Sequence, residues 1–296
     1  MIYTVTFNPS VDYVMHTDKL EYGIVNRSAS EEIYFGGKGI NVSLVLNELG
    51  VKSKALGFIA GFTGEAIENG IRKMGTDTDF IRLESGFSRI NIKIKSGEET
   101  ELNAQGPYID KTAVNSLFMK LKSLKDGDTL VLAGSIPKSL PDDIYEKILS
   151  FLADRKIKAV VDAEKNLLKN TLKYKPFLIK PNNFELEQLF GEKMENDEEV
   201  VSAALKLQQM GALNVLVSMG ERGAILVDEN NEVHKALPIC GTVKNSVGAG
   251  DSMIAGFLAG MENGDYEYAL SLGNATGAAT AFSSGLAKRE DILHLM

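Results

Sequence analysis

Several features that mark other classes of protein are missing from this chain. It contains one cysteine, Cys240, in 296 residues, so no internal disulfide can form. No run of about 18 apolar residues is present that could cross a membrane. The opening stretch MIYTVTFNPS also lacks the basic segment and long apolar core of a signal peptide. These absences predict a cytoplasmic protein.

Basic residues are in the minority as well. The chain has 32 Lys and Arg against 40 Asp and Glu, a net charge of -8. That balance disfavours nucleic acid or an anionic membrane as the main partner. Any anionic ligand must therefore be a small molecule that is held by local groups.

The order of apolar segments indicates the fold class. Runs rich in β-branched residues, such as IYTVTF, DTLVLAG, IKAVVDA and NVLVSMG, alternate with helical patterns. Buried strands separated by helices predict an α/β fold with a mostly parallel sheet that is covered on both faces. No linker-like stretch divides the sequence, so we expect one domain over residues 1–296.

Two segments break this alternation, about residues 11–35 and 88–103. Both have strand-like patterns and turns with no helix between them. They are interpreted either as surface hairpins or as a small sheet that forms a lid over the edge of an active site. In the second segment the alternation places Ile90, Ile92 and Ile94 on one face and Asn91, Lys93 and Lys95 on the other.

The stretch NSVGAGDSMIAGF, residues 245–257, combines a glycine-rich turn with the start of an apolar helix. Backbone N–H groups that gather at such a helix start, together with the helix dipole, can form an anion hole. Gly248, Ala249 and Gly250 would form it. Asp251, in the same turn, could then accept the proton of a hydroxyl that attacks a phosphoryl group. The alternative is that Asp251 only complements the helix dipole.

A second glycine-rich helix start is FGGKGIN, residues 35–41. Gly36 and Gly37 permit a ligand to approach the backbone closely, and Lys38 and Asn41 are one turn apart on one helix face. An ammonium and an amide suit a polyhydroxylated, negatively charged small molecule. An ordinary tight turn explains the glycines equally well, and the spacing is not that of a Walker motif.

Two further candidates for ligand binding lie at the ends of predicted strands. In TFNPSVD, Pro9 stops the first strand, so Asp12 can turn toward a sugar hydroxyl at the carboxyl edge of the sheet. Arg89 opens the second irregular segment, and its planar guanidinium fits a phosphate bidentately. The alternatives are a turn aspartate and a solvated surface arginine.

The stretches IKPNNFELEQLFG and VSMGERGAIL could border a nucleotide. Asn182 precedes a helix with Glu185 in its first turn, which could orient a metal ion through water or could simply form a capping box. The second stretch reads as two strands joined by a turn between Gly220 and Gly223, which could cradle phosphates.

Taken together, FGGKGIN, KPNNFE, SMGERGA and NSVGAGDSMIAGF resemble the signatures of the ribokinase-like carbohydrate kinases, the pfkB family. The resemblance runs over essentially the whole chain. Within the family the sequence is most similar to the branch of sugar-phosphate kinases that begin TxNPSxD and carry Lys in the first glycine motif. That branch contains 1-phosphofructokinase and tagatose-6-phosphate kinase. The resemblance implies a three-layer α/β/α core with a β-sheet lid.

The resemblance also implies a role for each motif. Asp251 would be the catalytic base beside the anion hole, and Lys38 with Arg89 would hold the phosphate that the sugar already carries. The sugar itself would be bound by Asp12, Gly36, Gly37, Lys38 and Asn41. The residues implied near ATP and its Mg²⁺ are Lys180, Asn182, Glu185 (through water to the metal), Ser218, Gly220, Gly223 and Asn274.

Other implications of the resemblance concern ions and assembly. It implies a homodimer that pairs through the lids, in which Arg27 could reach a neighbouring site. It also allows a potassium ion near Asn245 and Ser283.

Two departures from the family pattern stand out. Where relatives read Asp-Thr/Ser-Ser-Gly-Glu after the central strand, this chain reads DAEKN, which leaves a phosphate or magnesium role for Asp162 open. It also reads AGSIP where relatives have SGS, which keeps Ser135 as a possible ligand.

The resulting hypothesis is an ATP-dependent kinase that phosphorylates the 6-hydroxyl of fructose 1-phosphate. Tagatose 6-phosphate and fructose 6-phosphate remain alternative substrates, because motif spacing does not fix where the phosphate sits. A dinucleotide-binding oxidoreductase is the alternative of another class. It is disfavoured because GFIAGFTGE lacks the G-x-G-x-x-G spacing after the first strand.

Overall fold

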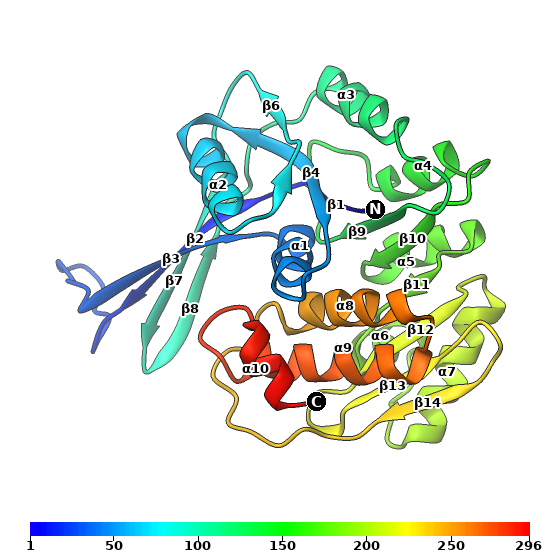
Figure 1. Cartoon of the computed structure of the whole chain (residues 1–296). Coiled ribbons are helices and arrows are strands. Elements are labelled where there is room, and N and C mark those ends of the chain that lie inside the picture. The colour runs from blue at the N-terminus through cyan, green and yellow to red at the C-terminus, as the bar shows by residue number, and fades with distance from the viewer.

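The strands form two sheets of unequal size (Figure 1). The computed structural model describes residues 1–296 apart from the side chain of Glu98. The large sheet has the order β14-β13-β12-β11-β10-β9-β1-β4-β5, with β6 beside β4. Its strands are β1 (Ile2–Thr6), β4 (Ser53–Ala60), β5 (Asp77–Thr78), β6 (Ile81–Leu83), β9 (Thr129–Ala133), β10 (Lys158–Asp162), β11 (Leu178–Ile179), β12 (Asn214–Ser218), β13 (Ala224–Val227) and β14 (Val233–Ala236).

The pairing within the large sheet follows from the apolar character of its strands. All five residues of β9 are buried, as are the last four of β10, so side chains on both faces of these strands pack against helices. The strands from β12 to β5 pair in parallel, and only β13 and β14 run antiparallel, at one edge. The prediction of a mostly parallel α/β sheet is confirmed.

Helices cover both faces of the large sheet. One face packs against α3 (Lys111–Leu121), α4 (Ile144–Phe151), α5 (Lys165–Thr171), α6 (Asn183–Phe190) and α7 (Asp197–Gln209). The other packs against α1 (Lys38–Glu48), α2 (Gly61–Lys73), α8 (Ala249–Gly260) and α9 (Tyr266–Ala281). Shorter elements are α10 (Arg289–His294) beside α9 and the 3₁₀ turns η1 (Leu172–Tyr174), η2 (Gly220–Arg222) and η3 (Met261–Asn263). Of the helices within the described residues, none is long and apolar enough to cross a membrane.

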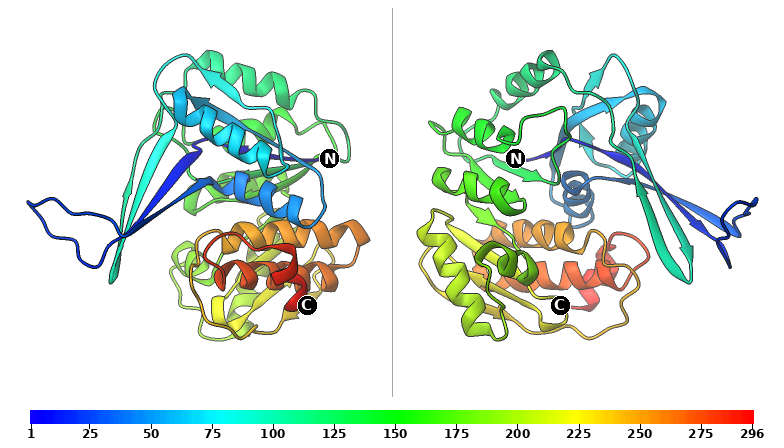
Figure 2. Two further views of the ribbon diagram at one scale, coloured as in Figure 1. Left: turned by 60° about the vertical axis from the view of Figure 1, so that its left-hand side comes forward. Right: turned by 180° about the vertical axis from the view of Figure 1, so that it is seen from behind.

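The small sheet projects from the core as an arm (Figure 2). It has the order β3-β2-β7-β8 and comprises β2 (Ser10–His16), β3 (Ser30–Gly36), β7 (Arg89–Ser96) and β8 (Glu98–Asn103). Its strands occupy the two segments predicted to break the α/β alternation and extend one residue beyond the first segment at each end. The polar face of β7 is the more buried one, since Asn91 is 5% exposed and Lys93 is 9% exposed. This face therefore lies toward the protein.

The parallel strands bring their carboxyl ends to one edge of the large sheet. Five adjacent strands end there, namely β1, β9, β10, β11 and β12, whose last residues are Thr6, Ala133, Asp162, Ile179 and Ser218. The strand order reverses at β1, which lies between β4 and β9. Ligands of open α/β sheets bind in the crevice at such a switch point, so this edge is where a site is expected.

Candidate active site

Asp251 lies in the first turn of α8 and is 5% exposed. Burial raises its pKa to about 7, and the nearby Asp162 carboxylate contributes in the same direction. The side-chain amide of Asn41, on α1, donates a hydrogen bond of 2.8 Å to Oδ2 of Asp251. The predicted acid therefore lies beside the first glycine motif, and its pKa is close to neutral pH.

The turn before Asp251 includes a left-handed backbone conformation at Gly248, which its glycine content had suggested. Gly248 is the N-cap of α8 with φ 83, and a Cβ there would lie 2.8 Å from Cδ2 of Leu286. The amide of Ala249 donates to the carbonyl of Ser246 at 3.2 Å. The Ala249 amide is therefore engaged within the turn, and the amides of Gly248 and Gly250 remain as the candidate donors of the predicted anion hole.

Two lysines flank the buried carboxylate of Asp162. Lys38 Nζ lies 2.9 Å from Oδ2, and Lys180 Nζ lies 3.4 Å from Oδ1. Burial alone would raise the pKa of Asp162, but the two ammonium groups hold it below its usual value. Burial likewise opposes the charge of Lys38, yet the attraction of Asp162 raises its pKa. Lys180 also reaches the start of α8, because a Cβ on Gly250 would lie 3.0 Å from its Nζ.

The sequence left the role of Asp162 open, and the structure places it at the centre of the charged groups. Asp162 lies at the carboxyl end of a parallel strand, β10, and a position at that edge of the sheet was also the reason to select Asp12 after β1.

The stretch DAEKN, which departs from the family pattern after Asp162, has an unusual backbone conformation. Lys165, at the position of Gly in the family pattern given above, has φ 49. That left-handed conformation is one that glycine adopts more readily than lysine.

The residues predicted to bind a sugar lie on both sides of the first glycine motif. Asp12, on β2, accepts a hydrogen bond of 2.8 Å from the amide of Asn91 on β7. Gly36 faces the other carboxylate oxygen, since a Cβ there would lie 3.2 Å from Oδ2. Gly37 has φ 130, and a Cβ on it would lie 2.5 Å from Cγ2 of Thr6, so only glycine fits.

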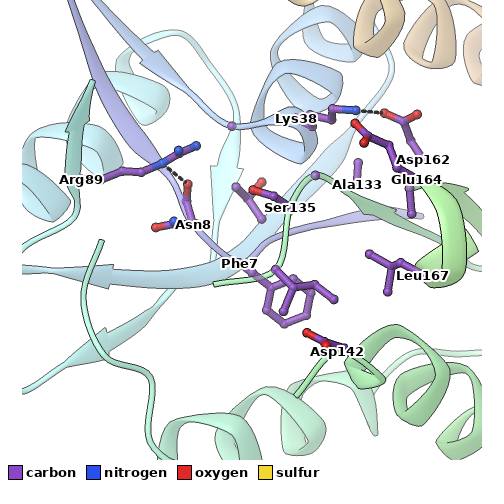
Figure 3. A pocket seen from close by; sticks show the side chains of 15 residues that line it. Phe7, Asn8, Lys38, Arg89, Ala133, Ser135, Asp142, Asp162, Glu164 and Leu167 are labelled. Carbon is purple, nitrogen blue, oxygen red and sulfur yellow. Dashed lines mark hydrogen bonds and ion pairs between the residues drawn. The ribbon is translucent and has the colours of Figure 1, made fainter. Parts of the chain in front are cut away.

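Arg89 and Lys38 share one cavity of about 460 Å³ (Figure 3). Arg89 lies at the start of β7, and its Nε donates to the carbonyl of Asn8 at 3.0 Å. Burial lowers the pKa of Arg89, and the charge of Asp12 works against that shift. Ser135, the hydroxyl kept in AGSIP, lines the same cavity, as does Asp162. Lys38, Arg89 and the Ser135 hydroxyl are groups that suit a phosphate, and the same cavity is also lined by the carboxylates of Asp142, Asp162 and Glu164.

A second cavity of about 640 Å³ lies between the small sheet and the turn at residues 283–288. Asp12, Gly36 and Asn41 line it. The two cavities meet at the first glycine motif, because Gly36 belongs to one wall and Gly37 to the other. Asp251 is in neither wall, but its hydrogen-bond partner Asn41 lines the second cavity.

The residues expected near a nucleotide form a neighbouring group. Asn182 and Glu185 make a complete capping box at the start of α6, with hydrogen bonds of 2.7 and 2.9 Å. Burial raises the pKa of Glu185, and the charge of Lys180 opposes the shift. Ser218 pairs with Asn182 as a β-bridge, so the ends of β11 and β12 adjoin. The capping interpretation of Asn182 and Glu185 is correct, and it leaves one carboxylate oxygen of Glu185 for a ligand.

The remaining nucleotide candidates lie farther along the same side. Gly220 and Gly223 bound the 3₁₀ turn η2 between the antiparallel strands β12 and β13, as the hairpin pattern predicted. Asn274 lies in α9, and its amide donates to the carbonyl of Leu237 at 2.9 Å. That hydrogen bond fixes the chain after β14 to α9.

Two side-chain clusters could bear on metal binding. The chain before α8 meets the turn after α9, where Asn245 donates to the carbonyl of Ser284 at 3.3 Å and Lys244 and Asn245 donate to Ala281. The two loops suggested for potassium thus adjoin. Asp228 and His234 lie together on the β13–β14 hairpin, but the carboxylate of Asp228 is already engaged by His234 and by two backbone amides.

Comparisons with known proteins agree with this geometry. The family model described as pfkB family carbohydrate kinase matches residues 5–292. The chain is 46% identical over 297 residues to 1-phosphofructokinase of Bacillus subtilis (strain 168), covering 100% of this chain and 97% of that protein. It is 39% identical over 288 residues to D-tagatose-1-phosphate kinase of Bacillus licheniformis, covering 97% and 94%.

The fold agrees with solved structures as well. Phosphofructokinase-2 of Escherichia coli in complex with substrates and products has a TM-score of 0.92 at 26% identity, covering 99% of this chain and 97% of that one. The same protein in complex with potassium has a TM-score of 0.91, with the same identity and coverage.

Proposed function

Since this chain belongs to the pfkB family of carbohydrate kinases and is a sugar-phosphate kinase, we propose that its acceptor is D-fructose 1-phosphate. The enzyme would transfer the γ-phosphoryl group of MgATP to the 6-hydroxyl and release fructose 1,6-bisphosphate and ADP. The relative that is 46% identical is named 1-phosphofructokinase. Because the chain belongs to this kinase family, the alternative of a dinucleotide-binding oxidoreductase is rejected.

One observation carries the proposal, namely that an acid and two lysines, Lys38 and Lys180, converge beside a cavity that Arg89 also lines. Asp251 is linked to α1 through Asn41, and Lys180 lies against Gly250 and Asp162. The cavity with Lys38 and Arg89 adjoins the one with Asp12 and Asn41. A sugar phosphate needs both features, cationic side chains for its phosphate and hydrogen-bond acceptors for the hydroxyls of its sugar.

The proposed chemistry is a direct transfer in which positioning and charge neutralisation dominate. Asp251 accepts the proton of the attacking hydroxyl as that oxygen bonds to phosphorus. A pKa of about 7 lets Asp251 be ionised at neutral pH and still be basic enough to take the proton. The amides of Gly248 and Gly250, with the ammonium of Lys180, would stabilise the charge on the transferred group.

The residues fit a magnesium ion that arrives with ATP. One carboxylate oxygen of Glu185 accepts the hydrogen bond of the capping box. The other is available to a ligand, and the carboxylate lies near Lys180 and Asp162. Magnesium usually keeps several waters and binds few protein groups. Glu185 would hold it through water, and the ion would neutralise charge on the ATP phosphates.

A potassium ion is a further proposal for the loops near Asn245 and Ser283. Both loops adjoin the glycine turn before Asp251, and the backbone carbonyls of Ala281 and Ser284 join them there. The structure of phosphofructokinase-2 with potassium supports this for a relative. The potassium proposal is tested by comparing the turnover rate in K⁺ salts with the rate in tetramethylammonium salts at equal ionic strength.

We also propose a homodimer through the small sheet, which would act as a lid. An apolar row crosses all four strands of the small sheet, formed by the paired residues Ile33, Tyr13, Ile92 and Leu102. Ile33 is 57% exposed and Leu102 is 59% exposed, which is unusual for such a continuous row. A second copy would cover it, and exposed Arg27, beyond the end of β2, could then reach the partner's cleft.

A substrate panel tests the choice of acceptor. ADP release is measured with fructose 1-phosphate, D-tagatose 1-phosphate, fructose 6-phosphate and tagatose 6-phosphate at equal concentrations. We expect the highest kcat/KM for fructose 1-phosphate. A higher value for either 6-phosphate would contradict the proposal, and a higher value for D-tagatose 1-phosphate would assign the enzyme to the other carbon-4 epimer.

A further inference from the structure

We propose that Asp162 is a positioning residue that holds Lys38 and Lys180 at a fixed spacing, so that each serves a different phosphoryl group. The inference rests on the proposed kinase function. Lys38 would serve the phosphate that the acceptor already carries, and Lys180 would serve the group in transfer.

The geometry places one carboxylate between two ammonium groups from different elements. Asp162 ends β10 and is 3% exposed. Oδ2 accepts from Lys38, at the start of α1, and Oδ1 faces Lys180, which follows β11. Each oxygen is therefore assigned to one lysine, and the spacing of the two ammonium groups is set by a single rigid group.

The two ammonium groups point to different places. Lys38 has a side chain that is 40% exposed and lines the cavity that also contains Arg89 and Ser135. Figure 3 shows its ammonium group reaching from the glycine motif toward Asp162. Lys180 has a side chain that is only 5% exposed and lies against Gly250 at the start of α8. One lysine therefore faces the acceptor cavity and the other faces the anion hole.

Elementary electrostatics explains why an acid is needed between them. Two neighbouring ammonium groups repel each other, and the buried one of Lys180 also loses its hydration. A buried lysine without a partner gives up its proton or moves. The carboxylate of Asp162 keeps both charged and in place before any phosphate is bound. Phosphate groups that enter the site then find their cations already oriented.

Asp162 has a second effect, on the base itself. The groups that face Asp251 are Asp162 from β10, Lys38 and Asn41 from α1, and Lys180 just after β11. Of these, only Asp162 is negative, and its charge raises the pKa of Asp251. Removing that charge should therefore lower the pKa of the base, which a residue that only packed in the core would not do.

The test is Asp162→Asn, with kcat/KM for fructose 1-phosphate measured as a function of pH and of Mg²⁺. We expect a loss of about 10²-fold at the pH optimum, the size of effect that a small misplacement of a binding group produces. We also expect the acidic limb of the profile to move to lower pH, while the Mg²⁺ concentration for half-maximal rate stays unchanged. Asp162→Glu keeps the charge and should leave the limb in place.

Asp128→Asn is the matched control. Asp128 is also a buried acid in an ion pair, at 3.1 Å from the amino terminus. It lies just before β9, at the edge of the sheet opposite to the one where Asp162 lies. It should lower thermal stability and leave the pH profile unchanged.

The neutral pair Asp162→Asn/Lys180→Gln is the second variant, because it leaves no unpaired charge at position 180. If Asp162 acts through the lysine, the double variant loses less than the product of the two single losses. Multiplicative losses, or an acidic limb that does not move, would overturn the proposal. A raised Mg²⁺ requirement with an unmoved limb would assign Asp162 to the metal instead. Wild-type turnover is measured first, and its absence would contradict the proposed function alone.

Discussion

The side-chain amide of Asn41 donates a hydrogen bond of 2.8 Å to the carboxylate of Asp251, across 210 residues of sequence. The bond joins the first glycine motif on α1 to the second on α8. It orients the carboxylate, and it favours the ionised form, so it works against the burial that raises the pKa of Asp251. Asn41 therefore positions the proposed base in addition to lining the second cavity, the one that contains Asp12.

Asp251→Asn should remove the base and preserve the shape of the site. A general base typically contributes about 10²- to 10⁴-fold, so we expect kcat to fall by that factor. Binding of fructose 1-phosphate, measured by calorimetry, should be largely retained. Turnover close to that of the wild type would show that Asp251 is not the base.

Activity should fall in acid because Asp251 must be ionised to accept a proton. With a pKa of about 7, kcat/KM should decrease as pH falls through that value. Asn41→Ala removes a hydrogen bond that lowers the pKa of Asp251, so the acidic limb should move to higher pH. The profile is recorded for the free enzyme at low substrate. A shift to lower pH in the variant would contradict the assignment of the limb to Asp251.

The same buried acid should cost stability at neutral and alkaline pH. Its pKa is raised from 3.8 to about 7, so the stability of the native state is lost progressively as pH rises between these values. Asp251→Asn has no charge to bury. Its melting temperature, relative to that of the wild type, should therefore increase from pH 4 to pH 7 and then level off. A difference that is independent of pH would show that Asp251 does not titrate in this range.

Arg89→Gln should separate recognition of the phosphate from recognition of the sugar. Hydrogen bonds to charged groups are worth about 1.5–3 kcal/mol, which corresponds to a loss of about 10- to 150-fold in kcat/KM for fructose 1-phosphate. Activity toward free fructose should change little. Arg82→Gln, on β6 and outside both cavities, is the control. Equal losses on both substrates would indicate a folding defect rather than lost phosphate binding.

Leu102→Glu should convert the proposed dimer to a monomer. Leu102 ends the apolar row across the small sheet and is 59% exposed, so a charge there would be buried by a partner. Sedimentation velocity measures the outcome. Met119→Glu, at a 67% exposed methionine on α3, should leave the dimer intact. An unchanged sedimentation coefficient for Leu102→Glu would place any dimer contact elsewhere.

Local signals in the sequence were sufficient for the elements and most of the motifs. The glycine motifs at 36–39 and 248–250 begin α1 and α8, and the capping pattern at Asn182 and Glu185 begins α6. These follow from short-range preferences, because a helix start needs particular residues within one turn. The strand patterns of residues 11–35 and 88–103 also indicated strands outside the α/β alternation. They left open whether these strands form separate hairpins or one small sheet, and they did not show which face of the sheet is buried.

Contacts between distant segments were decided only by the tertiary structure. Nothing near Asp162 in the chain indicates that its carboxylate binds Lys38 and Lys180, or that Asn41 would orient Asp251. Sequence determined which side chains stand at the carboxyl ends of strands and at helix starts. Their distances, burial and pKa values depend on how parallel strands bring those ends to one edge, and a linear pattern of residues does not encode that arrangement locally.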